Sequence, residues 1–197
     1  MVYEIIIQSL WLIIPAYVAN GCAALVGGGK PIDFGKKYKD GKRILGDGKT
    51  WRGLIIGTLL GTIGGFACSV GARYAANYDF PLELSDFTGF PLMIPIVFSI
   101  SFGALMGDVI ESFFKRRRGI DRGKDWIPFD QLDFIAGVLF FSFIMAGFLQ
   151  IAALTDGNWF FENFSVWHIV FLLFVTPLFH VFGNFLHKKG KTKQTSK

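Results

Sequence analysis

Five long apolar segments constrain this chain more than any other feature of its sequence. They cover about residues 2–26, 53–72, 91–114, 134–154 and 166–186. A helix needs about 20 mostly apolar residues to cross a bilayer core of roughly 30 Å, so each segment is long enough. Because 52% of the 197 residues are hydrophobic and only 18% are charged, a water-soluble domain is excluded. The sequence predicts an all-α integral membrane protein with five transmembrane helices in one domain, residues 1–187.

The basic residues lie almost entirely in alternate loops. Nineteen of the 20 lysines and arginines fall in residues 30–52, 115–133 and 188–197, and only Arg73 lies elsewhere. Because basic loops stay on the cytoplasmic side of a membrane, we predict a multi-pass protein of the cell membrane with its N-terminus outside and its C-terminus inside. Residues 30–52 and 115–133 then form two functional cytoplasmic loops, and 188–197 form a flexible tail that the anionic lipid surface attracts.

Small and aromatic residues suggest how the helices pack. Gly57 and Gly61 lie four residues apart in the second segment, a spacing that lets helices approach closely in lipid. We predict that they pack within one bundle. A dimer seam is the alternative, so the oligomeric state stays open. Trp159 and Trp167 suit an aromatic belt at the outer membrane interface.

The third segment ends with a stripe of polar side chains. Asp108, Glu111, Ser112 and Lys115 are spaced i, i+3, i+4 and i+7, so they share one face of a helix over two turns. Ionisable groups at the mouth of a membrane helix are costly and are therefore candidates for function. The alternative is a Glu–Lys pair that merely ends the helix.

A second acidic pair follows at the start of the fourth segment. Asp130 and Asp133 are spaced i, i+3, and alone they would suit capping of a helix and its positive dipole end. Beside the acids of the third segment, however, they make four carboxylates that repel one another unless a cation lies among them. Oxygen ligands without Cys or His nearby favour Mg²⁺ over zinc. We therefore predict Asp108, Glu111, Asp130 and Asp133 as Mg²⁺ ligands.

Both predicted cytoplasmic loops combine basic residues with glycines, which free backbone N–H groups to approach phosphate oxygens. The stretch G-D-G-K-T at 46–50 fails the P-loop spacing, because Arg43 stands where the first glycine belongs. No Ser–His or Cys–His pair marks a covalent nucleophile. Basic, glycine-rich loops beside acids that can bind Mg²⁺ predict phosphoryl-type chemistry on a polyphosphate.

A more specific pattern joins the third and fourth segments. The run G-D-V-I-E-S-F-F-K-R at 107–116, followed by G-I at 119–120, K-D at 124–125, Pro128 and D-Q-L-D at 130–133, resembles the signature of the phosphatidate cytidylyltransferases of bacteria. The loop P-I-D…D-G-K-R-I-L-G-D-G-K-T-W-R-G and the small size resemble the archaeal branch, the CDP-archaeol synthases. The bacterial His-Gly-Gly stretch before the last D-x-x-D is absent, which favours that branch. The resemblance covers about residues 20–133.

The resemblance implies transfer of CMP from CTP to an isoprenoid glycerol phosphate lipid, which forms CDP-archaeol and pyrophosphate with Mg²⁺. Asp108, Lys115, Asp130 and Asp133 would be the catalytic residues. The nucleotide would be bound by polar side chains of both loops and of the helix ends: Lys49, Lys115 and Lys124 at the phosphates, Thr50, Arg43, Arg52 and Ser112 in support, and Asp33 and Asn20 at cytosine or ribose. The partners would be CTP, the lipid substrate and the bilayer, with no nucleic acid.

Other functions remain open from the residues alone. A transporter for a phosphorylated anion could also use basic loops and buried acids, although it should scatter ionisable groups across the membrane midplane. An acyltransferase or prenyltransferase, or a membrane scaffold without catalysis, are further alternatives. Nucleotide dependence separates them from a cytidylyltransferase.

Overall fold

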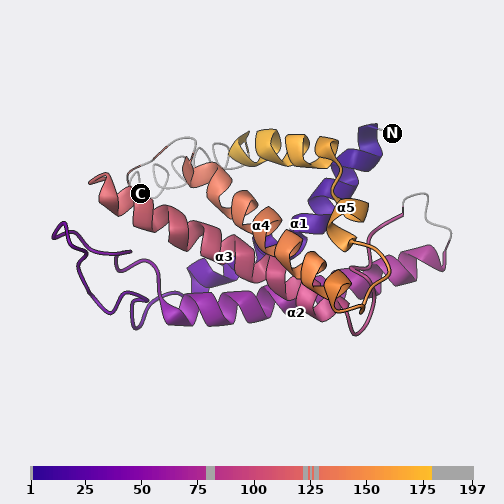
Figure 1. Cartoon of the computed structure of the whole chain (residues 1–197), viewed down its shortest axis with the longest axis horizontal. Helices are drawn as coiled ribbons and strands as arrows, with labels where there is room; N and C mark the ends of the chain where they lie inside the picture. Colours follow the sequence, from indigo (N-terminus) through magenta and orange to yellow (C-terminus); the bar gives the residue numbers. More distant parts are fainter. Residues whose placement is uncertain (1, 79–82, 122–123, 125, 127–128, 179–197) are drawn as a thin grey trace, which may run out of the picture.

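The computed structural model describes residues 2–78, 83–121, 124, 126 and 129–178. Four long helices dominate it, and a fifth, short helix precedes another apolar helix, Val166–Leu178. The labelled helices are α1 (Val2–Val26), α2 (Trp51–Ala76), α3 (Met93–Arg117), α4 (Phe129–Ile151) and α5 (Trp159–Asn163) (Figure 1). All four long helices contain a stretch that is long and apolar enough to cross a membrane. The described residues contain isolated β-bridges but no strand.

The all-helical membrane class is confirmed, whereas the fifth span stays a prediction. Helix Val166–Leu178 covers only the first part of the predicted segment 166–186, and the rest of it, like the tail 188–197, lies outside the described residues. Both α3 and α4 extend into the predicted loop 115–133. Lys115 therefore lies in the last turn of α3, and Asp130 lies in the first turn of α4. Both positions suit the helix dipole, which favours basic residues at the end of a helix and acids at its start.

Glycines bring α2 against α1 and α3. A Cβ added at Gly61 would lie 2.7 Å from Ala19 Cβ, and one added at Gly65 would lie 2.6 Å from Val97 Cβ. The glycine face of α2 is therefore used inside the bundle, as predicted from its spacing.

The crossing of α3 and α4 is closer still, and among the described helices these two pack against each other most extensively. A Cβ added at Gly107 would lie 2.1 Å from the carbonyl oxygen of Asp133, and one at Gly137 would lie 2.0 Å from that of Gly103. No larger residue fits at these positions without moving a helix. The close crossing therefore sets the end of α3 directly beside the start of α4.

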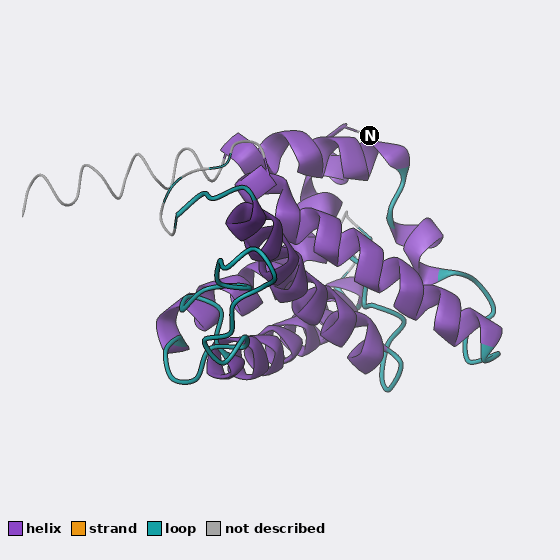
Figure 2. Ribbon diagram, turned by 60° about the vertical axis from the view of Figure 1, so that its left-hand side comes forward, coloured by secondary structure: helices purple, strands orange, loops and turns teal. Residues whose placement is uncertain are grey.

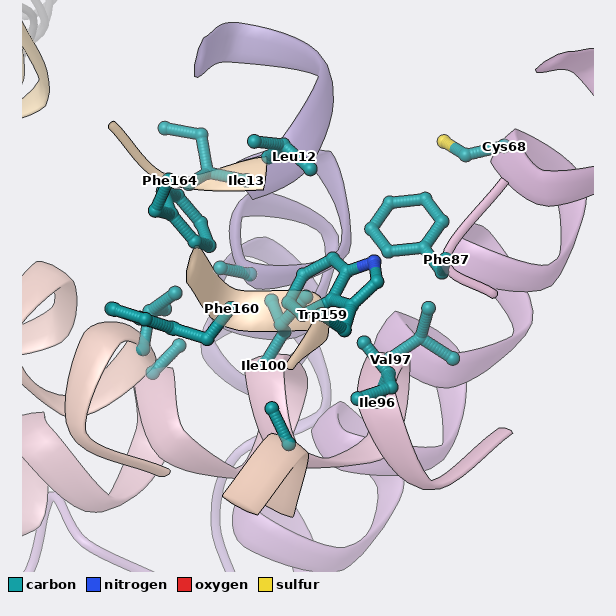
Figure 3. Close-up of a cluster of buried hydrophobic side chains, with 14 of the residues drawn as sticks. Leu12, Ile13, Cys68, Phe87, Ile96, Val97, Ile100, Trp159, Phe160 and Phe164 are labelled. Carbon is teal, nitrogen blue, oxygen red and sulfur yellow. The ribbon is translucent and has the colours of Figure 1, made fainter. Parts of the chain in front are cut away.

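The hydrophobic core is built around Trp159 of α5, as Figure 3 shows. Its indole stacks on Phe87 with a centroid distance of 5.9 Å and packs in the same cluster as Leu12 of α1 and Val97 of α3. The side chain is only 2% exposed, so the prediction that it lies in an interface belt was wrong. Trp167 is 68% exposed. Sequence position alone did not distinguish a tryptophan at a membrane surface from one that α5 folds inward.

The first loop, residues 27–50, covers the end of the bundle at which α1 and α3 end and α2 and α4 begin, here called the basic end. Figure 2 shows loops gathered over the helix ends there. Bridges join Pro31 to Thr50 and Lys37 to Arg43, which closes the loop on itself. Thr50 then caps α2, because its hydroxyl oxygen accepts a hydrogen bond from the Gly53 N–H at 3.1 Å.

Candidate active site

Three carboxylates from two helices meet at the basic end. Asp108 and Glu111 of α3 and Asp133 of α4 each offer one oxygen, and these atoms lie within 4.8 Å of one another. The close α3–α4 crossing brings them together. One oxygen of Glu111, Oε1, is buried and accepts no hydrogen bond in the described structure. A buried carboxylate oxygen without a hydrogen-bond donor is costly, and an oxygen-seeking divalent cation would relieve that cost.

Asp130, the fourth predicted ligand, lies outside this group of three. Its two carboxylate oxygens lie 2.8 and 2.7 Å from Lys115 Nζ, and it accepts a hydrogen bond of 2.8 Å from the Trp126 backbone N–H. Lys115 Nζ also lies 3.8 Å from Glu111 Oε1. The structure therefore pairs the predicted phosphate-binding Lys115 with two acids of the site, on a side chain that is only 10% exposed.

Lys49 connects the first loop to the acids. Its Nζ lies 2.5 Å from Oδ2 of Asp108, although 59 residues separate the two in sequence. Lys49 directly precedes Thr50, the capping residue of α2, so the start of that helix places the lysine over the end of α3. A charge-assisted pair of this kind is stronger than a neutral hydrogen bond.

A first cavity of about 340 Å³ lies between the four helix ends. One part of its wall is small and apolar, with Ala23, Ala24 and Leu54. The other part is polar and holds side chains that the sequence analysis singled out: Asn20, Lys49, Thr50, Asp108, Asp130 and Asp133. A mixed wall of this kind suits a nucleoside, which has an apolar face and polar edges.

A second cavity, of about 250 Å³, adjoins the same acids on the side of the first loop. It is more strongly charged, and its wall includes loop residues 45–49. Its other lining residues are Asp108, Glu111, Ser112, Lys115, Arg116, Asp130 and Asp133. Glycine backbone and three basic side chains beside a cluster of acids can bind a polyphosphate together with its cation.

An apolar groove of about 680 Å³ runs between α3 and α4 on the other side of the acids. Its apolar wall includes Ile110, Phe114 and Phe140, while Glu111 and Asp133 border both this groove and the second cavity. At the polar part of the groove, the Arg118 guanidinium lies 5.0 Å from the centre of the Trp126 ring. A charged cavity and an apolar groove therefore meet at two carboxylates.

Asp33, predicted to recognise the base or ribose, is instead enclosed by the first loop, with its side chain 0% exposed. It accepts hydrogen bonds from the Arg43 guanidinium at 2.9 and 3.2 Å and from the backbone N–H groups of Gly35, Leu45 and Gly46 at 3.0, 3.0 and 3.1 Å. Burial alone would raise the pKa of this carboxyl, but these donors hold the pKa well below its usual range.

Three other predicted nucleotide contacts lie away from the acids in the described residues. Arg43 pairs with Asp33 and lines a neighbouring surface cavity. Arg52 is exposed in the first turn of α2. Lys124 is exposed and lies 3.2 Å from Asp121. None of the three lines the two polar cavities or the groove described above.

Arg116 lines the second cavity, although the sequence analysis treated it only as part of the basic run and gave it no role of its own. Its Nε donates to the Leu45 carbonyl oxygen at 3.3 Å. The signal was available, because Arg116 follows Ser112 by four residues and so continues the same helical stripe.

Fold and site together define the class: a multi-pass membrane protein whose acid-lined polar site lies at one end of a helical bundle, next to an apolar groove. A solved structure described as an intramembrane enzyme for archaeal membrane lipids biosynthesis has the same fold. It matches with a TM-score of 0.67 and 31% identity, covering 89% of this chain and 92% of that chain.

The chain matches the CarS-like CDP-archaeol synthase family over residues 2–195 and belongs to it. CDP-archaeol synthases from Thermococcus kodakarensis and Methanocella arvoryzae are 39% and 42% identical, covering 91% and 90% of this chain and 90% and 97% of theirs. The one from Methanocaldococcus jannaschii is 45% identical over 74% of this chain and 80% of its own length. The family and its class of reaction, CTP-dependent nucleotidyl transfer that forms CDP-archaeol, are as the sequence predicted.

Proposed function

We propose that this chain binds CTP with Mg²⁺ at its acid cluster and transfers CMP to the phosphate of an isoprenoid glycerol lipid. The products are CDP-archaeol and pyrophosphate. One observation carries the proposal: Glu111 and Asp133 border both the charged second cavity and the apolar groove. A nucleotide in the polar cavities and a lipid in the groove would therefore bring their phosphates together at these carboxylates.

Asp108, Glu111 and Asp133 would hold the metal ion. Their oxygens lie within 4.8 Å of one another and Glu111 Oε1 accepts no hydrogen bond, which fits the all-oxygen coordination that Mg²⁺ prefers. When bound, Mg²⁺ neutralises triphosphate charge and stabilises the leaving pyrophosphate. Asp130 would serve by holding Lys115 at the edge of this cluster, since its two oxygens face that ammonium group.

The polar side chains divide between the two ends of CTP. Lys49, Lys115 and Arg116 line the charged second cavity, and we assign them to the phosphates, with Ser112 as a hydroxyl donor. Asn20 and Thr50 line the first cavity beside small apolar residues. The Asn20 amide carries both donors and an acceptor, so it can bind cytosine or ribose.

The lipid phosphate would attack the α-phosphorus directly. A new bond forms between a lipid phosphate oxygen and that phosphorus, while the bond from the same phosphorus to pyrophosphate breaks. A phosphate monoester already carries about −1.5 to −2 charges at neutral pH, so no strong general base is needed. Because the lipid phosphate is itself the nucleophile, the transfer needs no enzyme-bound nucleotide.

The site would face the cytoplasm, where CTP is made. Support comes from the basic loops, since the first loop and the end of α3 carry most of the positive charge in the described residues.

The proposal is tested by incubating detergent-purified protein with each of four radiolabelled NTPs, with Mg²⁺ or a chelator, and with a lipid phosphate carrying isoprenoid or acyl chains. We expect nucleotide-bearing lipid and equimolar pyrophosphate only with CTP, Mg²⁺ and the isoprenoid lipid. Label that stays on the protein after CTP alone would contradict direct transfer. Anion flux into sealed vesicles without any nucleotide product would favour a transporter.

A further inference from the structure

Arg117, the last residue of α3, binds the first loop from several directions. Its guanidinium lies over the ring of Tyr38, 4.7 Å from the centroid, and over that of Phe113, 5.1 Å away. It also forms an ion pair of 2.7 Å with Asp40. The side chain is only 17% exposed, yet it lines neither polar cavity nor the groove. Arg117 therefore contacts the loop rather than the space where substrates would lie.

Hydrogen bonds from side chains to backbone carbonyl oxygens run in both directions across this contact. Arg117 Nη2 donates to the carbonyl oxygens of Arg43 and Lys42, and Lys42 Nζ donates back to the Arg117 carbonyl oxygen at 3.2 Å. That carbonyl belongs to the last turn of α3, where no further helical turn supplies a donor. Loop residues 38–43 are thus attached to the end of α3 by a cation–ring contact, an ion pair and hydrogen bonds to backbone carbonyls.

The attachment continues through the loop to Lys49. Arg43, whose carbonyl Arg117 binds, holds Asp33 through its guanidinium, and Asp33 in turn accepts the backbone N–H groups of Leu45 and Gly46. Three residues further on, Lys49 meets Asp108 at 2.5 Å. A continuous set of contacts therefore joins the end of α3 to the lysine that faces the acids.

We propose that Arg117 is a positioning residue: it holds loop residues 38–46 on α3 and so sets where Lys49 meets the nucleotide phosphates. The inference rests on the proposed function, in which Lys49 contacts CTP. Arginine suits the task because its planar guanidinium stacks on rings while its N–H groups bind a carboxylate and carbonyls at the same time. A lysine carries the same charge but lacks the planar guanidinium and its several N–H donors.

Kinetics test this inference first. In Arg117→Ala we expect KM for CTP to rise about tenfold, because a loop contact coupled to the site is lost, while KM for the lipid stays unchanged. Arg117→Lys should recover only part of the loss. Arg73→Ala, an exposed arginine at the opposite end of α2, is the matched control and should keep both values. A fall in kcat of similar size, with no change in KM for CTP, would overturn the proposal.

A double-mutant cycle then asks whether Arg117 acts through Lys49. Equilibrium binding of radiolabelled CTP with Mg²⁺ is measured for Lys49→Ala, Arg117→Ala and the double variant. If the arginine only places the lysine, the double variant binds CTP no more weakly than Lys49→Ala alone. Losses that multiply would overturn the proposed route.

Hydrogen exchange of the ligand-free protein separates this inference from the proposed function. In Arg117→Ala the amides of residues 38–46 should exchange at least about tenfold faster, while those of the α3–α4 crossing stay unchanged. Unchanged exchange in the loop overturns the inference even where the enzyme makes product. A wild-type protein that forms no CTP-dependent product contradicts the proposed function. In that case, amide exchange in residues 38–46 still shows whether Arg117 holds the loop on α3.

Discussion

Basic and acidic side chains at the basic end form ion pairs with each other. Lys49 faces Asp108, and Lys115 faces Asp130. Partly buried charges of this kind need partners, because desolvation of an isolated charge is costly. Binding of a metal ion and a triphosphate would replace one set of pairs with another, the cation taking Asp108 and the phosphates taking Lys49. In the proposed function, Asp108 and Lys49 would therefore each exchange one charged partner for another.

Asp133 is the acid whose substitution tests the metal site most directly. Asp133→Asn keeps the shape of the side chain but removes the charge, so we expect product formation with CTP to fall about 100-fold or more. Thermal unfolding should show that the protein still folds. Asp156→Asn, at an exposed position after α4, is the matched control and should keep full activity. Similar losses in both variants would contradict a specific role for Asp133.

Asp33 makes the order of the first loop depend on pH in a defined direction. Because its pKa is depressed in the folded protein, its contribution is complete above the ordinary value of about 3.9 and is lost only as pH falls through the lower folded value. Hydrogen exchange at Leu45 and Gly46, corrected for intrinsic rates, should therefore show constant protection from pH 7 down to about pH 4. Asp33→Asn should lose this protection already at pH 7; retained protection would contradict the role assigned to the carboxylate.

At the scale of elements, the end of α3 organises the site. It carries two acids of the cluster, Lys115 with its partner on α4, and the two arginines that bind the first loop. The C-terminal turn of a helix attracts cations, so the basic residues stabilise the same turns that present the acids. The position of α4 relative to α3 then decides whether the acids meet.

The α3–α4 crossing is tested by Gly107→Ala. Its new Cβ would lie 2.1 Å from the Asp133 carbonyl oxygen, so the helices must separate, and overpacking of this kind costs about 1–3 kcal/mol. We expect the thermal midpoint in detergent to fall by about 5 °C and the Mg²⁺ concentration needed for activity to rise. Gly147→Ala, on α4 with no atom within 4 Å of the new Cβ, should leave both unchanged. A Gly107→Ala protein with wild-type stability would contradict the close crossing.

At the scale of the whole molecule, the two ends of the bundle differ in charge and in what joins them. At the end opposite the site, the loop between α2 and α3 is attached to the N-terminal half of α1. Gln8 Nε2 and Trp11 Nε1 donate to the carbonyl oxygens of Glu83 and Ser85 at 3.1 and 2.9 Å. The basic end carries the first loop and the acids. This separation is the basis for the proposed orientation.

The orientation is tested by labelling single cysteines in intact cells with a membrane-impermeant maleimide. With Cys22 and Cys68 replaced by Ser, Glu83→Cys should react in intact cells, whereas Lys39→Cys should react only after permeabilisation. Both parent side chains are exposed, so access through the membrane is the difference between them. The reverse pattern would place the site outside and contradict the proposed orientation.

Several features of this protein could be predicted from local patterns in its sequence. Apolar length determined the membrane class, and the period of a helix placed Asp108, Glu111 and Lys115 on one face. These inferences succeed because they depend on residues a few positions apart, whose relative placement a helix dictates. The motif at 107–133 also indicated the family, which the comparisons confirm.

The four acids of the site were predicted to meet, but the tertiary structure alone decided how they divide. It kept Asp133 with Asp108 and Glu111, as predicted, but paired Asp130 with Lys115. It also enclosed Asp33 in the first loop and placed Trp159 in the core. No spacing along the chain encodes these outcomes. They depend on how closely glycine-lined helices cross and on where a loop of 24 residues folds back. Contacts across the bundle therefore decided that Asp133 lines the cavities, that Asp33 is enclosed by the loop and that Trp159 packs in the core.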